Sequence, residues 1–294
     1  MSTAGDTAYL ASGLYAQIFA EAIIAYSDAN IISRLVNAKG VQNADTASWQ
    51  VVNRGTNKLD SSDLGAVTDG SEIAATAVNT DKKTATLAPF AVRTDVYDDT
   101  KYSNISDQAA FVGGLLGNAA SAYVDKQLAE LFSDFNATGD AGTSSIGMTV
   151  DNLYSALGFL RLYGARGMPR AVFHPSQIVG TYGLMNDLVT SDQFGGTPDL
   201  QNQGLKDAWV DRIAGIDVFQ SLEVETHGST SAYGGVFVKD AIGLAYKEFA
   251  AGQPFWIEKE RHATYERDVW MAHLFFNSIE LDDYWGCMID TKIA

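Results

Sequence analysis

The 294-residue sequence predicts an α+β fold, and three observations carry that prediction. A polar stretch over residues 49–83 is expected to form a long two-stranded arm. A long amphipathic helix is expected over residues 107–135. After residue 149 short helices and strands alternate, which is typical of a compact α/β unit.

The arm is the most unusual of these segments. It reads WQVVNRGTNKLDSSDLGAVTDGSEIAATAVNTDKK, with few large apolar side chains. Short β-like runs at Trp49–Val52 and Ile73–Val78 flank a Gly/Asn/Asp/Ser centre and indicate two strands. Loops longer than ~15 residues are rare inside a compact domain, and an isolated hairpin is marginal in water. An ordered arm therefore needs cover, most simply from a second copy of the chain; a mobile surface loop is the alternative.

Two neighbouring rows of apolar residues at i, i+4 spacing predict a helix over residues 7–37. The rows are Leu14, Ile18 and Ala22, and Tyr15, Phe19, Ile23 and Tyr26. Asp28 and Asn30 are expected to interrupt this helix, and Gly40 is expected to end it.

The segment TATLAPFAVRTDVYDD, residues 84–99, alternates as a strand does. Its two faces are Phe90, Val92, Thr94 and Val96 on one side, and Arg93, Asp95 and Tyr97 on the other. Pro89 has no N–H to donate, which predicts an edge or a bulge of the sheet at its position.

The helix over residues 107–135 would be roughly 43 Å long at 1.5 Å per residue. Its apolar rows are Phe111, Leu115, Ala119 and Tyr123, and Val112, Leu116, Ala120, Val124, Leu128 and Phe132. Asn104 or Ser106 can cap its start. Gly113, Gly114 and Gly117 lower its helix propensity, which predicts that another backbone crosses closely there.

A Gly/Ser/Thr-rich stretch over residues 136–148 is the best candidate for a domain boundary. After it, Thr149 can cap a helix that continues to about Tyr163, with Met148 and Leu153 as a hydrophobic staple. Further strands are expected over residues 170–173, 216–219 and 236–238, a helix begins at Pro175, THGSTSAYGG is turn-rich, and residues 255–288 are strand-like and aromatic.

Composition excludes several classes of protein. Hydrophobic residues make up 46% and charged residues 19%, which is typical of a globular chain. No apolar run approaches the ~18 residues of a membrane helix, and no secretory signal is recognisable. Acidic residues outnumber basic ones 36 to 20, a net charge of −16, so tight binding of nucleic acid is not expected. The single cysteine, Cys287, is predicted to be a small buried hydrophobe.

Motifs for chemistry are not recognisable, so no catalytic, cofactor-binding or metal-binding residue is predicted. Glycine-rich phosphate loops are missing, and none of the four histidines has a partner at metal-ligand spacing. His174-Pro175-Ser176 could hold a nucleophile, but no GxSxG elbow surrounds it. A strand-to-helix turn is the preferred interpretation.

Two other groups of residues have a functional and a bland interpretation. The acidic groups Asp98-Asp99 and Glu280, Asp282 and Asp283 could do acid/base work, could bind Ca²⁺, or could form a solvated turn or face. The late aromatic residues could line a ligand pocket, although core and subunit-interface positions are more typical. They are Trp256, Trp270, Phe275, Phe276, Tyr284 and Trp285.

Three local sequence segments, taken in order, point to a known family. TATLAPFAVRTDVYDDT looks like a strand that leaves an extended loop, PRAVFHPSQI looks like a strand-turn-helix, and AGIDVFQSLEV is followed by GGVFVKDAIGLAYKE. With the order of helix, arm, strand, long helix, glycine-rich stretch, α/β unit and returning strands, they resemble the major capsid proteins of tailed bacteriophages. These proteins have the Hong Kong 97-type shell fold, which encapsulins share.

The resemblance implies a division of nearly the whole chain. Residues 1–48 would be an N-terminal arm, 49–83 an extended β-hairpin loop, 84–148 a peripheral domain with a spine helix, 149–250 an α/β axial domain, and 251–294 the return strands of the peripheral domain.

The same resemblance implies a function. The chain would be a major capsid protein and not an enzyme, and would assemble as pentamers and hexamers into an icosahedral head shell. The shell would enclose double-stranded DNA without binding it tightly or specifically. Scaffolding, portal and decoration proteins would be partners, with no membrane; assembly would occur in the host cytoplasm and the product would be the virion. Since the chain begins almost at once with its first helix, a separate scaffolding protein or prior processing is expected.

Two alternative functions stay open, and one modification is suggested. An encapsulin-like compartment would enclose a cargo enzyme, and a hydrolase would use Ser176 and His174 in the unit over residues 149–250. Some members of the family join a loop lysine to an asparagine by an isopeptide bond, with a carboxylate as base. The crosslink candidates in this sequence are Lys58, Asn277 and Glu280.

Overall fold

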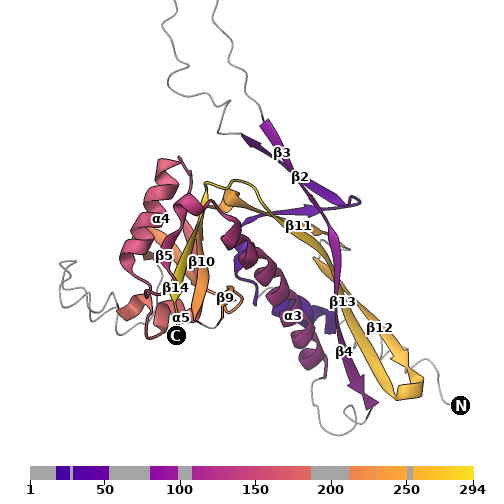
Figure 1. Cartoon of the computed structure of the whole chain (residues 1–294). Helices are drawn as coiled ribbons and strands as arrows, with labels where there is room; N and C mark the ends of the chain where they lie inside the picture. The colour runs from indigo at the N-terminus through magenta and orange to yellow at the C-terminus, as the bar shows by residue number, and fades with distance from the viewer. Residues whose placement is uncertain are drawn as a thin grey trace, which may run out of the picture.

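The computed structural model describes residues 18–26, 29–52, 80–98, 108–186, 212–228, 230–249 and 254–294. They form two β-sheets, a separate two-stranded ribbon, and the long helix α3 (Gln108–Glu130), which lies against one sheet and reaches the other (Figure 1). Among these residues no helix is both long and apolar enough to span a membrane.

The first sheet has five strands with β13 at its centre. They are β1 (Asn37–Val41), β11 (Ile242–Lys247), β13 (Arg267–Glu280), β12 (Phe255–His262) and β4 (Ala88–Tyr97). β13 pairs antiparallel with β4, β12 and β11, and β1 adds to β11 in parallel. Phe90, Val92 and Val96 of β4 pack against the core, as the alternation predicts. Among the described strands β4 pairs with β13 alone, so the edge position predicted from Pro89 is confirmed.

Helix α3 packs on this sheet mainly with one of its two predicted apolar rows, and Tyr123 of the other row contacts Phe90 and Phe276. Val112, Leu116 and Leu128 are fully buried in the core, whereas Phe111 and Leu115 are 55% and 46% exposed. The helix continues as a 3-10 helix over Leu131–Asp134, so the element predicted over residues 107–135 is confirmed in its described part.

The helix over residues 18–26 crosses α3 where the sequence predicts a close approach. A Cβ on Gly113 or Gly117 would collide with the backbone carbonyl oxygens of Ile18 and Ala22, respectively. Gly114, in contrast, faces open space. Two of the three glycines therefore permit the crossing of the two helices.

The end of the N-terminal helix was predicted wrongly. In the described residues, helix covers 18–26, a 3-10 helix covers Ile32–Arg34, and Gly40 lies inside β1 instead of ending a helix. Residues 31–36 keep an apolar pattern, but residues 37–41 are extended, because β11 offers them a parallel ladder as β1.

The second sheet has seven strands. They are β5 (Ala141–Thr143), β14 (Gly286–Lys292), β10 (Ser231–Phe237), β6 (Arg170–Phe173), β8 (Ile216–Gln220), β7 (Arg212–Ile213) and β9 (Thr226–His227). Helix α4 (Val150–Leu162) packs on it through Leu153, Ala156 and Leu160, and α5 (Pro175–Val179) begins at Pro175 as predicted. Cys287 is buried in β14, as predicted, where its thiol donates to Gly139 O at 2.6 Å and burial raises its pKa to about 12.

Sheet pairing divides the chain differently from the predicted ranges at three strands. β5 lies inside the presumed boundary 136–148, β14 joins the seven-stranded sheet, and β11 joins the five-stranded one. β9 and β10 occupy much of the stretch predicted as turns. Strand partners come from distant parts of the chain, so local patterns do not reveal them.

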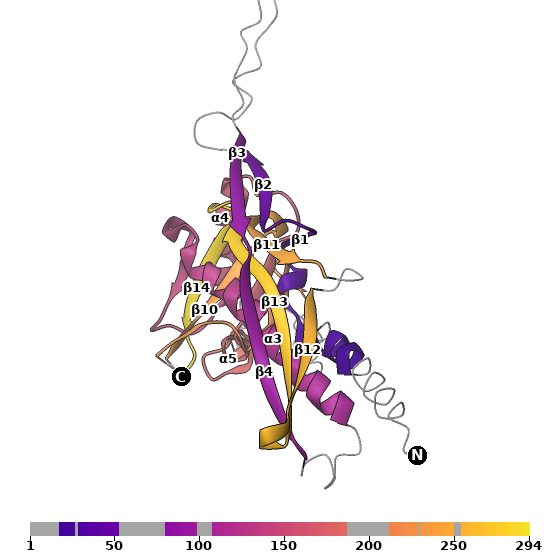
Figure 2. The same cartoon turned by 90° about the vertical axis from the view of Figure 1, so that its right-hand side faces the viewer.

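The ribbon consists of β2 (Thr46–Val52) and β3 (Thr80–Thr86), which pair antiparallel from Thr46↔Thr86 to Val52↔Thr80. It projects away from both sheets in the two views (Figures 1 and 2). The two-stranded arm predicted over residues 49–83 is therefore present at its base, whereas Ile73–Val78 lie outside the described residues.

Candidate functional site

The base of the ribbon is fixed to the five-stranded sheet by a small apolar cluster. Ala47, Ala85 and Ala245 are buried in it, and Trp49 and Phe275 pack around them. Gly243 in β11 leaves room for the Trp49 ring, because a Cβ there would lie 3.2 Å from its Cε2 atom. The cluster sets the direction in which the ribbon leaves the body.

The face of the β4–β13–β12 sheet that points away from α3 is named the outer face. Strand alternation and register place these side chains on it: Arg93, Asp95 and Tyr97 of β4; Arg267, Met271, His273 and Phe275 of β13; and Trp256, Glu258, Glu260 and His262 of β12. The outer face is thus rich in aromatic residues and arginine, the types that dominate binding at protein interfaces.

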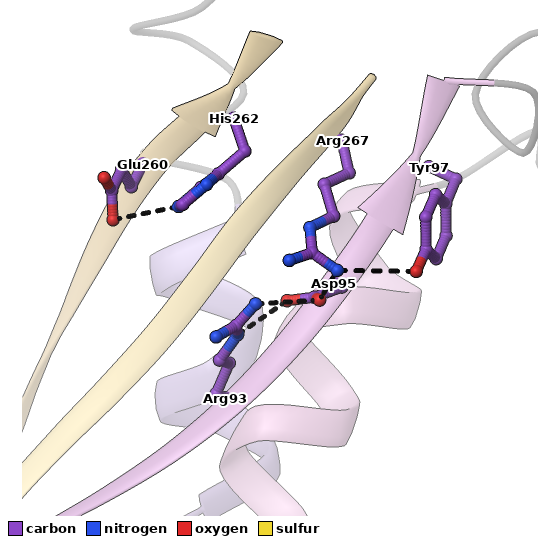
Figure 3. A network of polar contacts seen from close by, with 6 residues as sticks. All are labelled: Arg93, Asp95, Tyr97, Glu260, His262 and Arg267. Carbon is purple, nitrogen blue, oxygen red and sulfur yellow. Dashed lines mark hydrogen bonds and ion pairs between the residues drawn. The ribbon is translucent and has the colours of Figure 1, made fainter. Parts of the chain in front are cut away.

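Asp95 is the centre of the charged part of the outer face (Figure 3). Its carboxylate accepts hydrogen bonds from Arg93 Nε and Nη2 at 2.7 and 2.9 Å, and lies 2.8 Å from Arg267 Nη1. The bond from Arg93, helped by the positive charge of Arg267, holds the pKa of Asp95 below its usual value. The two guanidinium groups are therefore oriented before any partner arrives.

In the remaining part of the outer face, two histidines lie beside glutamates and one of them lies beside a tryptophan ring. His262 Nε2 lies 3.3 Å from Glu260 Oε2, and His273 Nε2 lies 3.5 Å from Glu258 Oε2. The Trp256 ring is 5.4 Å from the His273 ring and is 43% exposed. An exposed tryptophan on a rigid strand is suited to filling a recess in a partner.

A second charged cluster closes the tip of the same sheet on its other face. Arg261 Nη1 donates to Asp98 Oδ1 at 2.7 Å and to Asp268 Oδ1 at 3.1 Å, and Lys259 Nζ lies 2.9 Å from Asp268 Oδ2. These bonds tie β4 to the β12–β13 hairpin, and raise the pKa of Arg261 above its usual range. They thereby connect all three strands of the outer face at its tip.

The crosslink candidates are not brought together by the described residues. Lys58 lies outside them. Asn277 Nδ2 donates to Thr86 O at 2.8 Å, while Glu280, three residues further along β13, lies on the other face by strand alternation. Burial, and then Asp283, raises the pKa of Glu280 to about 6, and Lys83 opposes this shift.

The His174–Ser176 pair is a helix cap. His174 Nδ1 accepts the backbone N–H of Ser176 at 3.2 Å, and Gln177 Oε1 accepts the backbone N–H of His174 at 3.0 Å. Burial lowers the pKa of His174. Its Nδ1 lone pair is used by the backbone, so the strand-to-helix turn is the interpretation that the geometry supports.

The acidic groups considered as Ca²⁺ ligands have protein partners. Asp98 binds Arg261, Asp282 Oδ1 accepts the backbone N–H of Tyr284 at 3.1 Å, and Asp99 lies outside the described residues. In the part of the chain that the structure describes, no three acidic, histidine or cysteine side chains are grouped as for a metal ion.

Sequence reasoning missed one buried carboxylate, Asp125 of α3. Its oxygens accept the backbone N–H groups of Ile31, Ile32 and Ser33 at 2.8, 3.1 and 3.2 Å. Only 2% of the residue is exposed, and burial raises its pKa to about 6. The sequence held a usable signal, because Asp125 directly follows Val124, a member of the buried apolar row. An acidic side chain beside an apolar helix face needs hydrogen-bond donors from another segment of the chain.

No protein-family model and no curated protein matches the sequence. Solved structures do match. The capsid of the cyanophage P-SCSP1u has a TM-score of 0.63 at 15% identity, over 90% of this chain and 89% of that chain. The capsid of Ralstonia phage GP4 has a TM-score of 0.63 at 12% identity, over 88% and 87%.

An encapsulin is similar as well. The SrpI encapsulin of Synechococcus elongatus PCC 7942 has a TM-score of 0.58 at 14% identity, over 90% of this chain and 88% of that chain. At such identities the likeness shows the fold, which is the shell fold shared by phage capsids and encapsulins. The predicted Hong Kong 97-type fold is therefore confirmed.

Proposed function

We propose that this protein is the major capsid protein of a tailed phage, which assembles into the closed icosahedral shell of the head. The observation that carries the proposal is the match of about nine tenths of the chain to shell-forming proteins. The described residues add a second support: an outer face rich in aromatic and arginine side chains, which are typical of protein contacts.

The contact that we propose between neighbouring copies joins the ribbon of one copy to the outer face of the next. In the part of the chain that the structure describes, an apolar cluster around Trp49 covers the base of the ribbon. The outer face is aromatic and of mixed charge, so it can supply both apolar area and directional bonds. In this arrangement the five-stranded sheet with α3 is the peripheral domain and the seven-stranded sheet is the axial domain.

The larger assembly follows the same proposal. Copies gather as pentamers and hexamers, and scaffolding, portal and decoration proteins act as partners during assembly in the host cytoplasm. The finished shell is part of the virion. A net charge of −16 per copy supports enclosing DNA without specific binding, because like charges repel.

Purification of the full chain, followed by size-exclusion chromatography with light scattering and electron microscopy, tests this function. We expect closed particles of megadalton mass. Particles from infected or co-expressing cells should show the absorbance ratio of nucleic acid at 260 and 280 nm. A protein that remains monomeric under all conditions would contradict the proposal.

An encapsulin-like compartment is the second candidate, supported by the likeness to the SrpI encapsulin. The same particles distinguish the two, since a cargo-filled cage shows the absorbance of protein and yields a second polypeptide on a gel. A hydrolase has no such support, because the geometry gives His174 a capping role.

A further inference from the structure

Two histidines on the outer face each lie beside a glutamate. Glu260 and Glu258 are 60% and 52% exposed, and His262 and His273 are 34% and 25% exposed. All four residues are thus partly open to water, although the Nε2 atom of His273 is itself buried and has no hydrogen-bond partner among the described residues. Histidine is the side chain whose ordinary charge change falls between pH 5 and 8.

We propose that the outer face is a proton-sensitive contact surface for a second copy of this chain, and that protonation of His262 and His273 strengthens the contact. The inference rests on the proposed function, because it requires copies that assemble through this face.

The charges around His262 come from three strands. Glu260 lies beside it on β12, and Arg267 is its cross-strand partner on β13. Asp95 on β4 interacts electrostatically with His262, and Tyr97 of the same strand belongs to the same group of side chains (Figure 3). One carboxylate is thus beside the ring and a second is near it, opposed by Arg267, which is itself bound to Asp95. A proton on His262 therefore has acceptors to interact with.

The surroundings of His273 are less charged and more aromatic. Glu258 lies across from it on β12, and its β4 partner is the uncharged Ala91. The Trp256 ring lies next to it, and the cation Lys247 lies over Phe275 and pairs with Asp45 at the ribbon base. A protonated His273 would interact with both Glu258 and the π face of Trp256, which would hold this exposed ring in place.

Charge complementarity favours a second copy as the occupant. With neutral histidines the outer face carries two arginines and three carboxylates, one net negative charge; two protons make it one net positive charge. Every copy carries −16, and the stretch between the ribbon strands, residues 53–79, has four acidic and two basic residues. Acidification therefore turns repulsion from an acidic neighbour into attraction.

The proposal is tested by light scattering of the purified full chain. The measured quantity is the threshold concentration for assembly, at constant ionic strength, from about pH 7.5 to about pH 5.5. We expect the wild-type threshold to fall by about threefold to tenfold on acidification. The variant His262→Gln/His273→Gln keeps polar side chains without a titrating ring, and should lose most of this fall. His227→Gln is the matched control, because His227 is exposed on β9 of the other sheet.

A second variant tests the charge argument without relying on histidine. Glu258→Gln/Glu260→Gln removes two negative charges, so its threshold near pH 7.5 should approach that of the wild type near pH 5.5. Burial raises the pKa of Asp125 and of Glu280 to about 6, and both residues remain in every variant. Any pH dependence that they cause would persist in the histidine variant.

The outcomes separate the two claims. A wild-type threshold that does not change with pH would overturn the inference, as would an unchanged pH dependence in the histidine variant. Both results leave the proposed function intact, because particles still form. If no particle forms at any pH, the proposed function fails and the inference falls with it.

Discussion

Asp125 shows how a single side chain determines the course of the N-terminal segment. Its carboxylate accepts hydrogen bonds from the three consecutive backbone N–H groups of residues 31–33, which lie about 90 positions away along the chain. Helix α3 thereby provides the cap that this 3-10 helix lacks in its own sequence, since its N-cap residue Ile31 has no side-chain acceptor for a hydrogen bond. The bonds lead the chain from the first helix into β1.

Asp125→Ala should lower the free energy of unfolding by about 2–4 kcal/mol, because buried backbone donors lose their acceptor. Chemical denaturation measures this loss. Asp134→Asn, at an exposed position, is the matched control and should change stability by less than about 0.5 kcal/mol.

The loss should also depend on pH. Burial raises the pKa of Asp125 in the folded protein to about 6, above its ordinary value of 3.8, so the folded state binds the proton more tightly than the unfolded state. Its contribution to stability is then greatest below about pH 4 and falls as the pH rises to about 6. The difference between wild type and variant should be larger at acid pH; a constant or opposite difference would contradict the stated ionisation.

At the level of elements, α3 presents two apolar rows to different surroundings. Leu116 lies in the core, whereas its neighbour Leu115 is 46% exposed. The exposed side also carries Gly114 with open space above it, while Gly113 and Gly117 touch the crossing helix. The helix is thus a spine with one buried and one accessible side.

Leu116→Asp should abolish soluble folding, because an unpaired buried charge costs several kcal/mol, comparable with the stability of a whole domain. Leu115→Asp is the matched control and should fold. Soluble yield and melting temperature check the pair. Equal behaviour of the two variants would mean that the buried side of α3 is assigned wrongly.

The glycines of α3 allow a test of the helix crossing. Gly117→Ala should destabilise the protein by roughly 1–3 kcal/mol, since its Cβ would collide with Ala22 O. Gly114→Ala should instead stabilise it by roughly 0.5–1 kcal/mol, because alanine has the better helix propensity and space is available. Thermal unfolding distinguishes the two directions, and a gain in both variants would show that the crossing can loosen.

For the whole molecule, the ribbon is the described part that projects furthest beyond its contacts with the body. Its apolar cluster lies at the base, at Trp49 and Ala85, and it projects from the body beyond that point (Figure 2). Such a projection is expected to act between copies. Two predictions about assembly follow from the ribbon and from the net charge.

Joining Val52 to Thr80 by an Asn-Gly turn removes residues 53–79 and keeps the register of β2 and β3. We expect a folded subunit with nearly unchanged cooperative unfolding that no longer forms closed shells. Electron microscopy and calorimetry provide the two readouts. Loss of cooperative unfolding would place the removed segment in the core instead.

Assembly should strengthen as salt rises from very low ionic strength. Each copy carries −16, and the Debye length falls from ~30 Å at 0.01 M to ~10 Å at 0.1 M, which screens the repulsion between copies. Light-scattering curves between ~10 and ~500 mM NaCl measure the effect. A continuous loss of assembly with salt would indicate that ion pairs such as those of Arg93 and Arg267 dominate the contacts.

The sequence alone determined the elements whose pattern is local and periodic: the α3 rows, the β4 alternation, the helix start at Pro175 and the two-stranded arm. Their order was sufficient to predict the shell fold. Only the tertiary structure decided the partners. It placed β1 on β11, assigned β5 and β14 to the second sheet, gave Asp125 its three donors and assembled the outer face from three strands. The physical reason is that strand pairing, burial and charge contacts join residues far apart in the chain, and local periodicity carries no record of which distant segment completes them.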